Sequence, residues 1–382
     1  MPIDSPASLR SAFAVPEDVS YFNTANLSPM LHAVQHAGED ALSRRARPWT
    51  IAEDDWFSGV ERLRALVGEL LGGDADGLAL VPATSYGFAV AANNLRPPSG
   101  SRVLVLDGEY PSGIYTWRRL AAQRELEILT VRREPGEAWA DAVLPRLDER
   151  VSVVSVPNVH WTDGSWVDLA SVAERAREVG AALVIDASQS LGAVPLDVGK
   201  LRPDFVTSVG YKWQLGPFGR GYLWAAPEHR DGSPLEENWI SRAESQDFAR
   251  LIDYRDAYQP GARRYDQGER TMFELTPMAI AATEQLLAWG VEDIASALAT
   301  VTGTIVERTR ELGLHPSAPK HGPHLIGLAV PEAMRDNIVP ALERARCYAA
   351  LRGSVLRISP HLHVTDADVD RLVDALSRAV AG

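Results

Sequence analysis

The sequence is poor in cysteine and in positive charge. Cysteine occurs once in 382 residues, as Cys347. A single cysteine excludes an internal disulfide framework, so a reducing, cytoplasmic setting is the natural expectation. Basic residues number 38 against 51 acidic residues, which gives a net charge of −13. Because no dense basic run offsets this excess, we expect no nucleic-acid partner.

Long apolar runs are also missing. No uninterrupted apolar segment approaches the ~18 residues of a membrane span, and the first residues, MPIDSPASLRSAF, contain no apolar signal region. We therefore expect no membrane association. The composition is that of an ordinary globular protein, with 46% hydrophobic and 23% charged residues. The length suits two domains of about 100 to 200 residues each.

Helical and strand patterns alternate through the first two thirds of the chain. Short apolar runs, such as 151–158 and 181–188, are separated by amphipathic helices, such as 168–180. Runs that are apolar on both faces and alternate with helices predict an α/β fold with a mostly parallel sheet covered by helices. After about residue 255, long helical patterns and then short strands predict a smaller α+β domain.

These patterns divide the chain into three predicted parts. The stretch YFNTANLSPM is too short to bury a core alone, so we expect residues 1–30 to pack between two domains. Residues 31–255 then form the large domain, and residues 256–382 form the small C-terminal domain. In such doubly wound sheets, ligands bind at the carboxyl ends of the strands.

Four short sequences fall at predicted strand ends. In VPATSYGF, Thr84 and Ser85 open a helix, where free N–H groups and hydroxyls either hold an anion or simply cap the helix. In VSVPNVHWTDG, Asn158 is either functional or an ordinary turn residue. In LVIDASQS, Asp186 ends an apolar strand, where a carboxylate must be paired, face a ligand or cap the next helix.

The fourth strand end is the most informative one. The run DFVTSV is soon followed by Lys212, and lysine is among the residues least often fully buried. A partly desolvated lysine has a lowered pKa and acts as a base or a Schiff-base nucleophile. An anion site, a buried aspartate and a strand-end lysine together match the needs of pyridoxal phosphate, whose phosphate, pyridine nitrogen and aldehyde they would hold.

A resemblance to a known family rests on five motifs in a fixed order: ATSYG, PNVHWTDG, VIDASQSLGAVPLDV, GYKWQLGPFGRGYLW and LRISPHLHVT. This series resembles the class V aminotransferase family of fold-type I pyridoxal-phosphate enzymes. The family includes cysteine desulfurases, kynureninases and isopenicillin N epimerase-like proteins. The resemblance extends from YFNTAN to the last helix, and it implies the fold of a fold-type I pyridoxal-phosphate-dependent transferase.

The resemblance implies roles for the motif residues. Lys212 matches the Schiff-base lysine, and Asp186 matches the partner of the pyridine nitrogen. Gln189 matches the residue that hydrogen-bonds the phenolic oxygen O3′ of the cofactor. Asn158 matches an asparagine near that oxygen and the substrate carboxylate. Arg357 matches the arginine that binds the α-carboxylate, a task that suits a two-pronged guanidinium.

The implied phosphate site departs from the family pattern at one position. Thr84 and Ser85 match the phosphate-binding turn, and Tyr211 matches a phosphate contact that is His or Tyr in relatives. Many relatives carry serine three residues before the lysine, where this chain has Val209. We expect that hydroxyl to be either lost or supplied by Ser208.

Two further contacts follow from the resemblance. By likeness to kynureninases, Tyr110 covers the face of the cofactor, whereas gapless spacing places Pro111 there. The segment RRYDQGERTMFELTP resembles one that reaches the cofactor of the partner subunit, and Gly268 and Thr271 are its expected contacts. A homodimer with composite active sites is therefore implied.

Cys347 bears on the choice of reaction. Cysteine desulfurases place their persulfide-forming cysteine on a mobile loop, whereas Cys347 lies in the apolar segment CYAALRG, where cysteine is usually a small core residue. The resemblance thus implies an enzyme that acts on an α-amino acid through an external aldimine, most like an aminotransferase. A C–S or other β-lyase without a catalytic cysteine, and an amino-acid epimerase, remain open alternatives.

Overall fold

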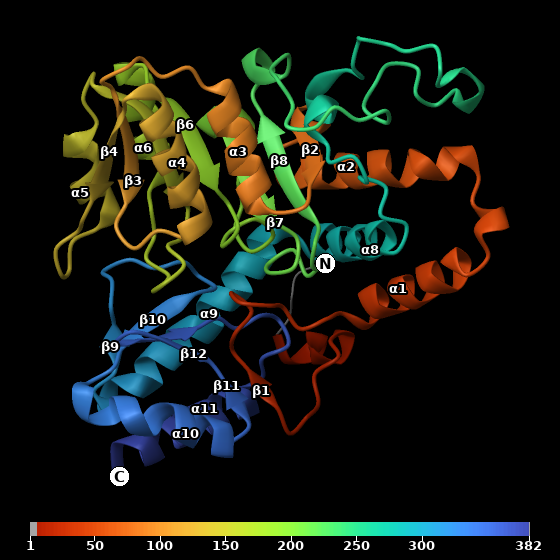
Figure 1. Cartoon of the computed structure of the whole chain (residues 1–382). Coiled ribbons are helices and arrows are strands. Elements are labelled where there is room, and N and C mark those ends of the chain that lie inside the picture. Colours follow the sequence, from red (N-terminus) through yellow and green to blue (C-terminus); the bar gives the residue numbers. More distant parts are fainter. Residues whose placement is uncertain (1–5, 382) are drawn as a thin grey trace.

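The computed structural model describes residues 6–381. Figure 1 shows a wide sheet covered by helices, with a smaller C-terminal part, drawn in blue, beneath it. The large sheet has seven strands in the order β2-β8-β7-β6-β5-β3-β4. The strands are β2 (Leu78–Val81), β3 (Arg102–Leu106), β4 (Glu127–Val131), β5 (Val151–Pro157), β6 (Ala182–Asp186), β7 (Phe205–Val209) and β8 (Gly221–Ala225).

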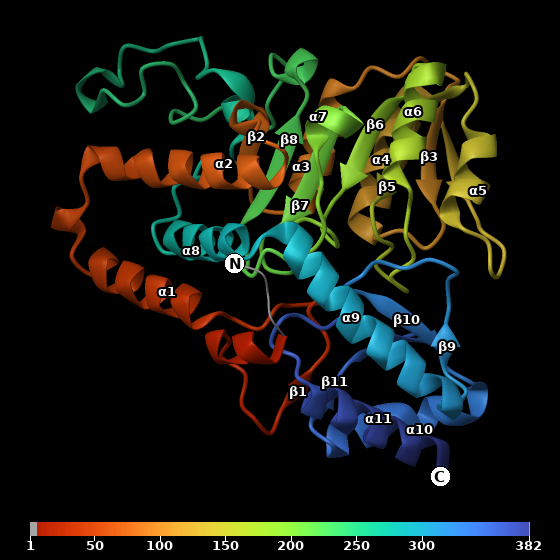
Figure 2. The ribbon, with the colours of Figure 1, turned by 180° about the vertical axis from the view of Figure 1, so that it is seen from behind.

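The prediction of a mostly parallel sheet is confirmed. Neighbouring strands from β7 to β4 run parallel, whereas β8 runs antiparallel to both β7 and β2. The reason lies in the connection, because residues 210–220 join β7 to β8 without a helix, and a parallel neighbour needs a longer crossover. The carboxyl ends of β5, β6 and β7 point toward the smaller part (Figures 1 and 2).

Helices cover both faces of this sheet. In β3, Leu104 and Leu106 join one buried cluster, and Val103 and Val105 join another. Because successive strand side chains point to opposite faces, this pattern requires cover on both sides. One face is covered by α2 (Ser58–Leu70), α5 (Trp139–Val143), α6 (Leu169–Val179) and α7 (Val198–Leu201), and the other by α3 (Thr84–Asn94) and α4 (Pro111–Arg124).

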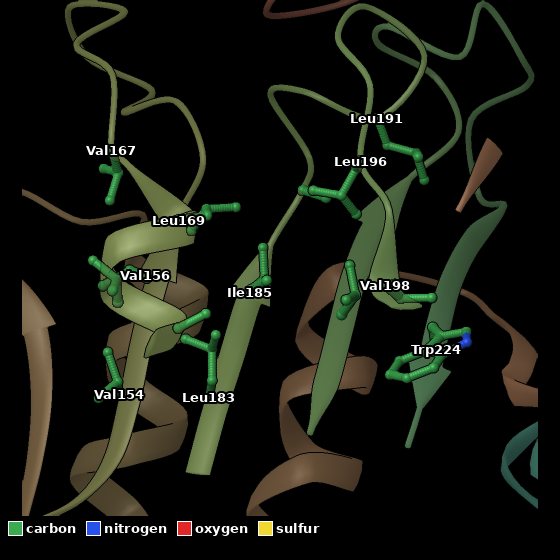
Figure 3. Close-up of a cluster of buried hydrophobic side chains, with 14 of the residues drawn as sticks. Val154, Val156, Val167, Leu169, Leu183, Ile185, Leu191, Leu196, Val198 and Trp224 are labelled. Atoms are coloured by element: carbon green, nitrogen blue, oxygen red, sulfur yellow. The ribbon is translucent and has the colours of Figure 1, made fainter. Parts of the chain in front are cut away.

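The first of these clusters is the larger one. Figure 3 shows how Val154 and Val156 of β5 and Leu183 and Ile185 of β6 face Leu169 of α6. Burial of each such aliphatic side chain stabilises the fold by roughly 1.5–3 kcal/mol. The cluster therefore fixes β5 and β6, whose carboxyl ends carry part of the pocket described below.

The C-terminal part has its own sheet and core. Its four strands run antiparallel in the order β12-β13-β10-β9. Ile305, Ile338 and Leu372, from three helices, pack in one buried cluster against this sheet. The strands are β9 (His315–Pro316), β10 (Ile326–Ala329), β12 (Ala350–Arg352) and β13 (Val355–Ile358), and the helices are α9 (Val291–Thr309), α10 (Arg335–Arg344) and α11 (Asp366–Ala381).

The N-terminal segment touches both parts of the molecule. Strand β1 (Ser20–Tyr21) pairs with β11 (Cys347–Tyr348), and Phe22 enters the core of the C-terminal part. On the other side, the backbone N–H of Ser28 donates to the carbonyl of Tyr211 at 3.0 Å. Residues 1–5 of the predicted segment lie outside the described residues.

Helix α8 (Leu275–Trp289) links the later chain to the large sheet. It packs on α1 (His32–Arg45) and α2, and its Ala279 joins the core of the large sheet. The predicted division of the chain near residues 30 and 255 stays a prediction. Within residues 6–381, none of the helices combines the length and the apolar character needed to cross a membrane.

Candidate active site

A pocket lies at the carboxyl ends of β5, β6 and β7. Several predicted site residues meet there, although they are far apart in the sequence. The pocket is lined by Thr84, Glu109, Tyr110, Pro157, Val159, Trp161, Asp186, Ser188, Gln189, Val209, Tyr211 and Lys212.

Lys212 lies in the turn that follows β7 and is only 9% exposed. Its Nζ lies 5.6 Å from the ring centroid of Tyr110 and 5.8 Å from that of Tyr211. No carboxylate lies within 4.0 Å of this amine among the described residues. Burial lowers the pKa of Lys212 to about 8, although the more distant Asp186 acts against that change. A lysine that is partly neutral near pH 8 can act as a nucleophile and as a base.

Asp186 is the last residue of β6, and it is 8% exposed. Its Oδ1 accepts a hydrogen bond from the backbone N–H of Ser188 at 2.8 Å. Burial raises the pKa of this carboxyl, while the bonds from Ser188 and the charge of Lys212 act in the opposite direction. A buried carboxylate without a paired cation is suited to hold a proton on a ligand nitrogen.

Glu109 also lines the pocket, and our sequence reasoning missed it. One carboxylate oxygen accepts a bond from the N–H of Tyr110 at 2.7 Å, and the other, Oε2, is buried with no partner among the described residues. Burial, and then the nearby Asp186, raise the pKa of Glu109 to about 8. The signal was available, because Glu109 follows β3 at the same edge of the sheet as the other candidates.

Two hydroxyls face the pocket from different elements. Thr84 begins α3, and its Oγ1 lies 3.0 Å from Oγ of Ser188. Hydroxyls beside the free N–H groups of a helix start form an anion site. Ser85, the other residue predicted for this turn, is exposed and is not among the lining residues.

The structure places Ser208 away from the pocket. Successive residues of a strand point to opposite faces, so Val209 lines the pocket and Ser208 does not. The hydroxyl of Ser208 donates to the carbonyl of Ala187 at 3.3 Å, and it accepts a bond from Gln214 at 3.3 Å. Ser188 offers a hydroxyl in the pocket that Val209 lines.

An aromatic wall borders the pocket near Lys212. The rings of Tyr110 and Trp161 meet edge to face, with centroids 5.6 Å apart. The indole N–H of Trp161 donates to the carbonyl of Gly108 at 2.8 Å, which ties the wall to the end of β3. Tyr110 lines the pocket, whereas Pro111 does not.

Arg357 lies on β13 and is 2% exposed. Its Nη1 donates to the carbonyl of Trp161 at 2.8 Å, and its Nη2 donates to Oδ1 of Asn23 at 3.3 Å. Its Nε has no partner, and no carboxylate pairs with it among the described residues. Burial lowers its pKa to about 10. An anionic ligand at this buried guanidinium would offset the cost of its burial.

Asn158, Gly268 and Thr271 do not line this pocket. Asn158 is buried between two lining residues, and its amide donates to the carbonyl of Val167 at 3.4 Å. The hydroxyl of Thr271 donates to the carbonyl of Trp56 at 2.8 Å. The contact of Gly268 and Thr271 with a partner subunit's cofactor stays a prediction.

Cys347 lies far from this chemistry. It belongs to β11, is 1% exposed and packs in the core of the C-terminal part. Burial raises the pKa of its thiol to about 12. Because the thiolate is the reactive form, this cysteine is poorly suited to act as a nucleophile.

The sequence profile of the family described as Aminotransferase class-V matches residues 24–372. The chain belongs to the aminotransferase class-V family. This confirms the resemblance that the five motifs predicted, and the members of this family depend on pyridoxal phosphate. The protein is therefore a pyridoxal-phosphate-dependent enzyme, a transferase or a lyase.

Two relatives in sequence and one solved structure are similar to this chain. The chain is 29% identical to isopenicillin N epimerase from Streptomyces clavuligerus, over 82% of each chain. It is 30% identical to kynureninase from Deinococcus radiodurans, over 72% of this chain and 67% of that protein. The structure of the cystine C–S lyase C-DES with its product cysteine persulfide superposes with a TM-score of 0.84 at 18% identity, over 94% of this chain and 98% of that chain. This likeness confirms the fold.

The pocket residues fit the family's cofactor on their chemistry. Lys212 is a buried amine without a paired carboxylate among the described residues. Asp186 is a buried carboxylate at a strand end, Thr84 offers a hydroxyl at a helix start, and Ser188 offers one in the turn after β6. These three features suit an aldehyde, a ring nitrogen and a phosphate, respectively.

Proposed function

We propose that the protein is an aminotransferase-like enzyme that acts on an α-amino acid at the pocket of Lys212. The observation that carries the proposal is the burial of two cations, Lys212 in the pocket and Arg357 outside its lining residues. Both are buried cations without a carboxylate partner among the described residues, and the charge of Arg357 contributes to the lowered pKa of Lys212. An α-amino acid carries an amine and a carboxylate on one carbon. Its carboxylate suits the buried guanidinium of Arg357, and its amine suits the site of the nucleophilic Lys212.

Each residue has a defined task in this proposal. Lys212 binds the cofactor and, once free, moves a proton to or from the substrate. Asp186 holds a proton at the pyridine nitrogen, and Thr84 and Ser188 bind the phosphate. Arg357 orients the substrate through its carboxylate. When bound, pyridoxal phosphate supplies an electron sink that weakens the bonds at the substrate's α-carbon.

A C–S or other β-lyase, or an amino-acid epimerase, is the second candidate. Glu109 favours it, because a carboxyl whose pKa is raised to about 8 is a second proton carrier in the pocket. Such a group can protonate a leaving group or a carbon, which elimination and epimerisation require. The 29% identity to an isopenicillin N epimerase is in keeping with this candidate. Burial of Cys347 speaks against a persulfide-forming desulfurase.

We also propose a cytoplasmic homodimer. The segment that carries Gly268 and Thr271 lies outside the pocket of its own chain, in keeping with the resemblance, which implies that it reaches a second subunit. Trp49 and Phe218 are 80% and 71% exposed, and large exposed aromatic side chains are common at subunit interfaces. The single, buried cysteine agrees with a reducing compartment.

A panel of amino acids tests the proposed reaction. Purified protein loaded with pyridoxal phosphate is incubated with each amino acid, with and without a keto-acid acceptor. We expect repeated turnover to a new amino acid and a new keto acid only when the acceptor is present, at most one equivalent of keto acid per active site without it, and no product from Lys212→Ala. Pyruvate with ammonia or sulfide and no acceptor would identify a β-lyase, and loss of chirality alone would identify an epimerase. A protein that binds no pyridoxal phosphate and converts no amino acid would contradict the whole proposal.

A further inference from the structure

The side-chain amide of Gln189 is held at both ends. Its Oε1 accepts a hydrogen bond from the indole N–H of Trp213 at 2.8 Å, and its Nε2 donates to the carbonyl of Ala25 at 3.1 Å. Gln189 is 4% exposed and Trp213 is 1% exposed. Because an indole N–H can only donate and a carbonyl can only accept, these two partners permit one orientation of the amide.

This orientation decides what Gln189 offers to the pocket. An amide nitrogen carries two hydrogens, and Ala25 takes one of them. Gln189 lines the pocket together with Asp186 and Lys212. Beyond the bond to Ala25, Nε2 keeps a second N–H without a partner among the described residues, and a negatively charged ligand oxygen takes this donor rather than Oε1.

Trp213 is itself fixed in place. The ring of His324 meets the indole edge to face, with centroids 4.2 Å apart, and His324 Nε2 donates to the backbone carbonyl of Gln189 at 2.5 Å. Gly192 has φ 95°, and a Cβ there would lie 2.6 Å from the carbonyl of Trp213. The turn after Gln189 and the turn that carries Lys212 are thus packed backbone to backbone.

We propose that Trp213 is a positioning residue that fixes the amide of Gln189, so that Gln189 presents an N–H to the phenolic oxygen of the bound cofactor. This inference rests on the proposed function and on the role of Gln189 that the family resemblance implies. A hydrogen-bond donor at the phenolic oxygen would stabilise the negative charge of that oxygen. The oxygen would then hold less tightly the proton that it shares with the nitrogen of Lys212. The donor therefore lowers the pH at which the bound cofactor changes its visible absorbance.

The test is a pH titration of the visible absorbance of the loaded enzyme, which does not depend on turnover. We expect Trp213→Phe, which keeps the ring and removes the N–H, to raise the midpoint by about one pH unit. Gln189→Leu should raise it by the same amount, and adding Trp213→Phe to Gln189→Leu should change nothing further. Trp289→Phe is the matched control, because Trp289 lies in the same hydrophobic cluster and makes no hydrogen bond to Gln189.

The outcomes separate this inference from the proposed function. A wild-type protein that takes up no pyridoxal phosphate overturns both. If the wild type titrates normally and Trp213→Phe leaves the midpoint unmoved, the inference alone is overturned. The same holds if Trp213→Phe moves the midpoint equally in the Gln189→Leu background, or if Trp289→Phe moves it as much.

A second variant covers the case in which Trp213→Phe does not fold. Gln189→Glu leaves Trp213 in place, and its Oε1 can still accept the indole N–H. We expect a larger rise of the midpoint than in Gln189→Leu, because an acceptor replaces the donor that faces the cofactor. An unchanged midpoint would show that an oxygen already faces the cofactor, and it would overturn the inference.

Discussion

The hydroxyls of Thr84 and Ser188 lie 3.0 Å apart in the wall of the pocket. They come from the start of α3 and from the turn after β6, so this contact joins two elements that are far apart in the sequence. We predict that Ser188→Ala weakens the binding of pyridoxal phosphate about tenfold, which corresponds to the loss of one hydrogen bond. Equilibrium titration of the cofactor-free protein, followed by absorbance, measures this affinity.

Ser208→Ala is the matched control for that prediction. Its hydroxyl is bonded to Ala187 and Gln214 and is directed away from the pocket, so the affinity should change less than in Ser188→Ala. If Ser208→Ala weakens binding more than Ser188→Ala does, our assignment of the phosphate hydroxyl is wrong.

The uptake of cofactor by the empty enzyme should depend on pH. The neutral amine of Lys212 is the nucleophile, and burial lowers its pKa to about 8. The rate should therefore rise with pH to a plateau, with a midpoint near pH 8. Stopped-flow absorbance at pH values between about 6 and about 10 gives the rate of cofactor uptake as a function of pH. In Asp186→Asn the midpoint should move to lower pH, because Asp186 favours the charged lysine. A midpoint at the ordinary lysine value in the wild type would refute this explanation.

Glu109 should make the stability of the cofactor-free protein depend on pH. Its folded pKa is about 8, above the value of about 4.3 for an unperturbed glutamate. The folded state therefore binds more protons than the unfolded state between these values, and stability falls as pH rises through that range. Glu109→Gln imitates the protonated form, so its advantage over the wild type should grow between pH 5 and pH 8 and then level off. Urea denaturation at several pH values tests this, and an advantage that does not change with pH would count against a buried, protonated Glu109.

Cys347→Ala should leave the reaction intact. The thiol is buried in the core of the C-terminal part, and its pKa is raised to about 12, so it contributes packing and no thiolate. We expect kcat to stay within about twofold of the wild type and the melting temperature to fall, as for a small cavity in a core. An inactive variant that is still folded and loaded with cofactor would restore a persulfide mechanism.

The sequence predicted the strand ends well, because each one combines an apolar run with a polar residue. Lys212 after DFVTSV and Asp186 after LVI could be predicted as pocket residues, since parallel strands bring their carboxyl ends to one edge. The alternation of strand side chains also explains why Val209, and not its neighbour Ser208, lines the pocket.

Other parts of the site could not be predicted from local pattern. Ser188 resembles an ordinary turn serine, and Glu109 resembles a surface residue after a glycine. The directions of these two side chains depend on how separate turns pack against each other. The partners of Arg357, the carbonyl of Trp161 and the side chain of Asn23, come from segments more than a hundred residues away, and only the packed structure brings them together.

Reduction of the loaded enzyme with borohydride tests the central claim most directly. Reduction fixes the cofactor to the amine that holds it, and peptide mass spectrometry then locates the modified residue. We predict that the label lies on Lys212 alone and is absent from that site in Lys212→Ala. A label on another lysine, or no label on a protein that has bound pyridoxal phosphate, would contradict the role of Lys212.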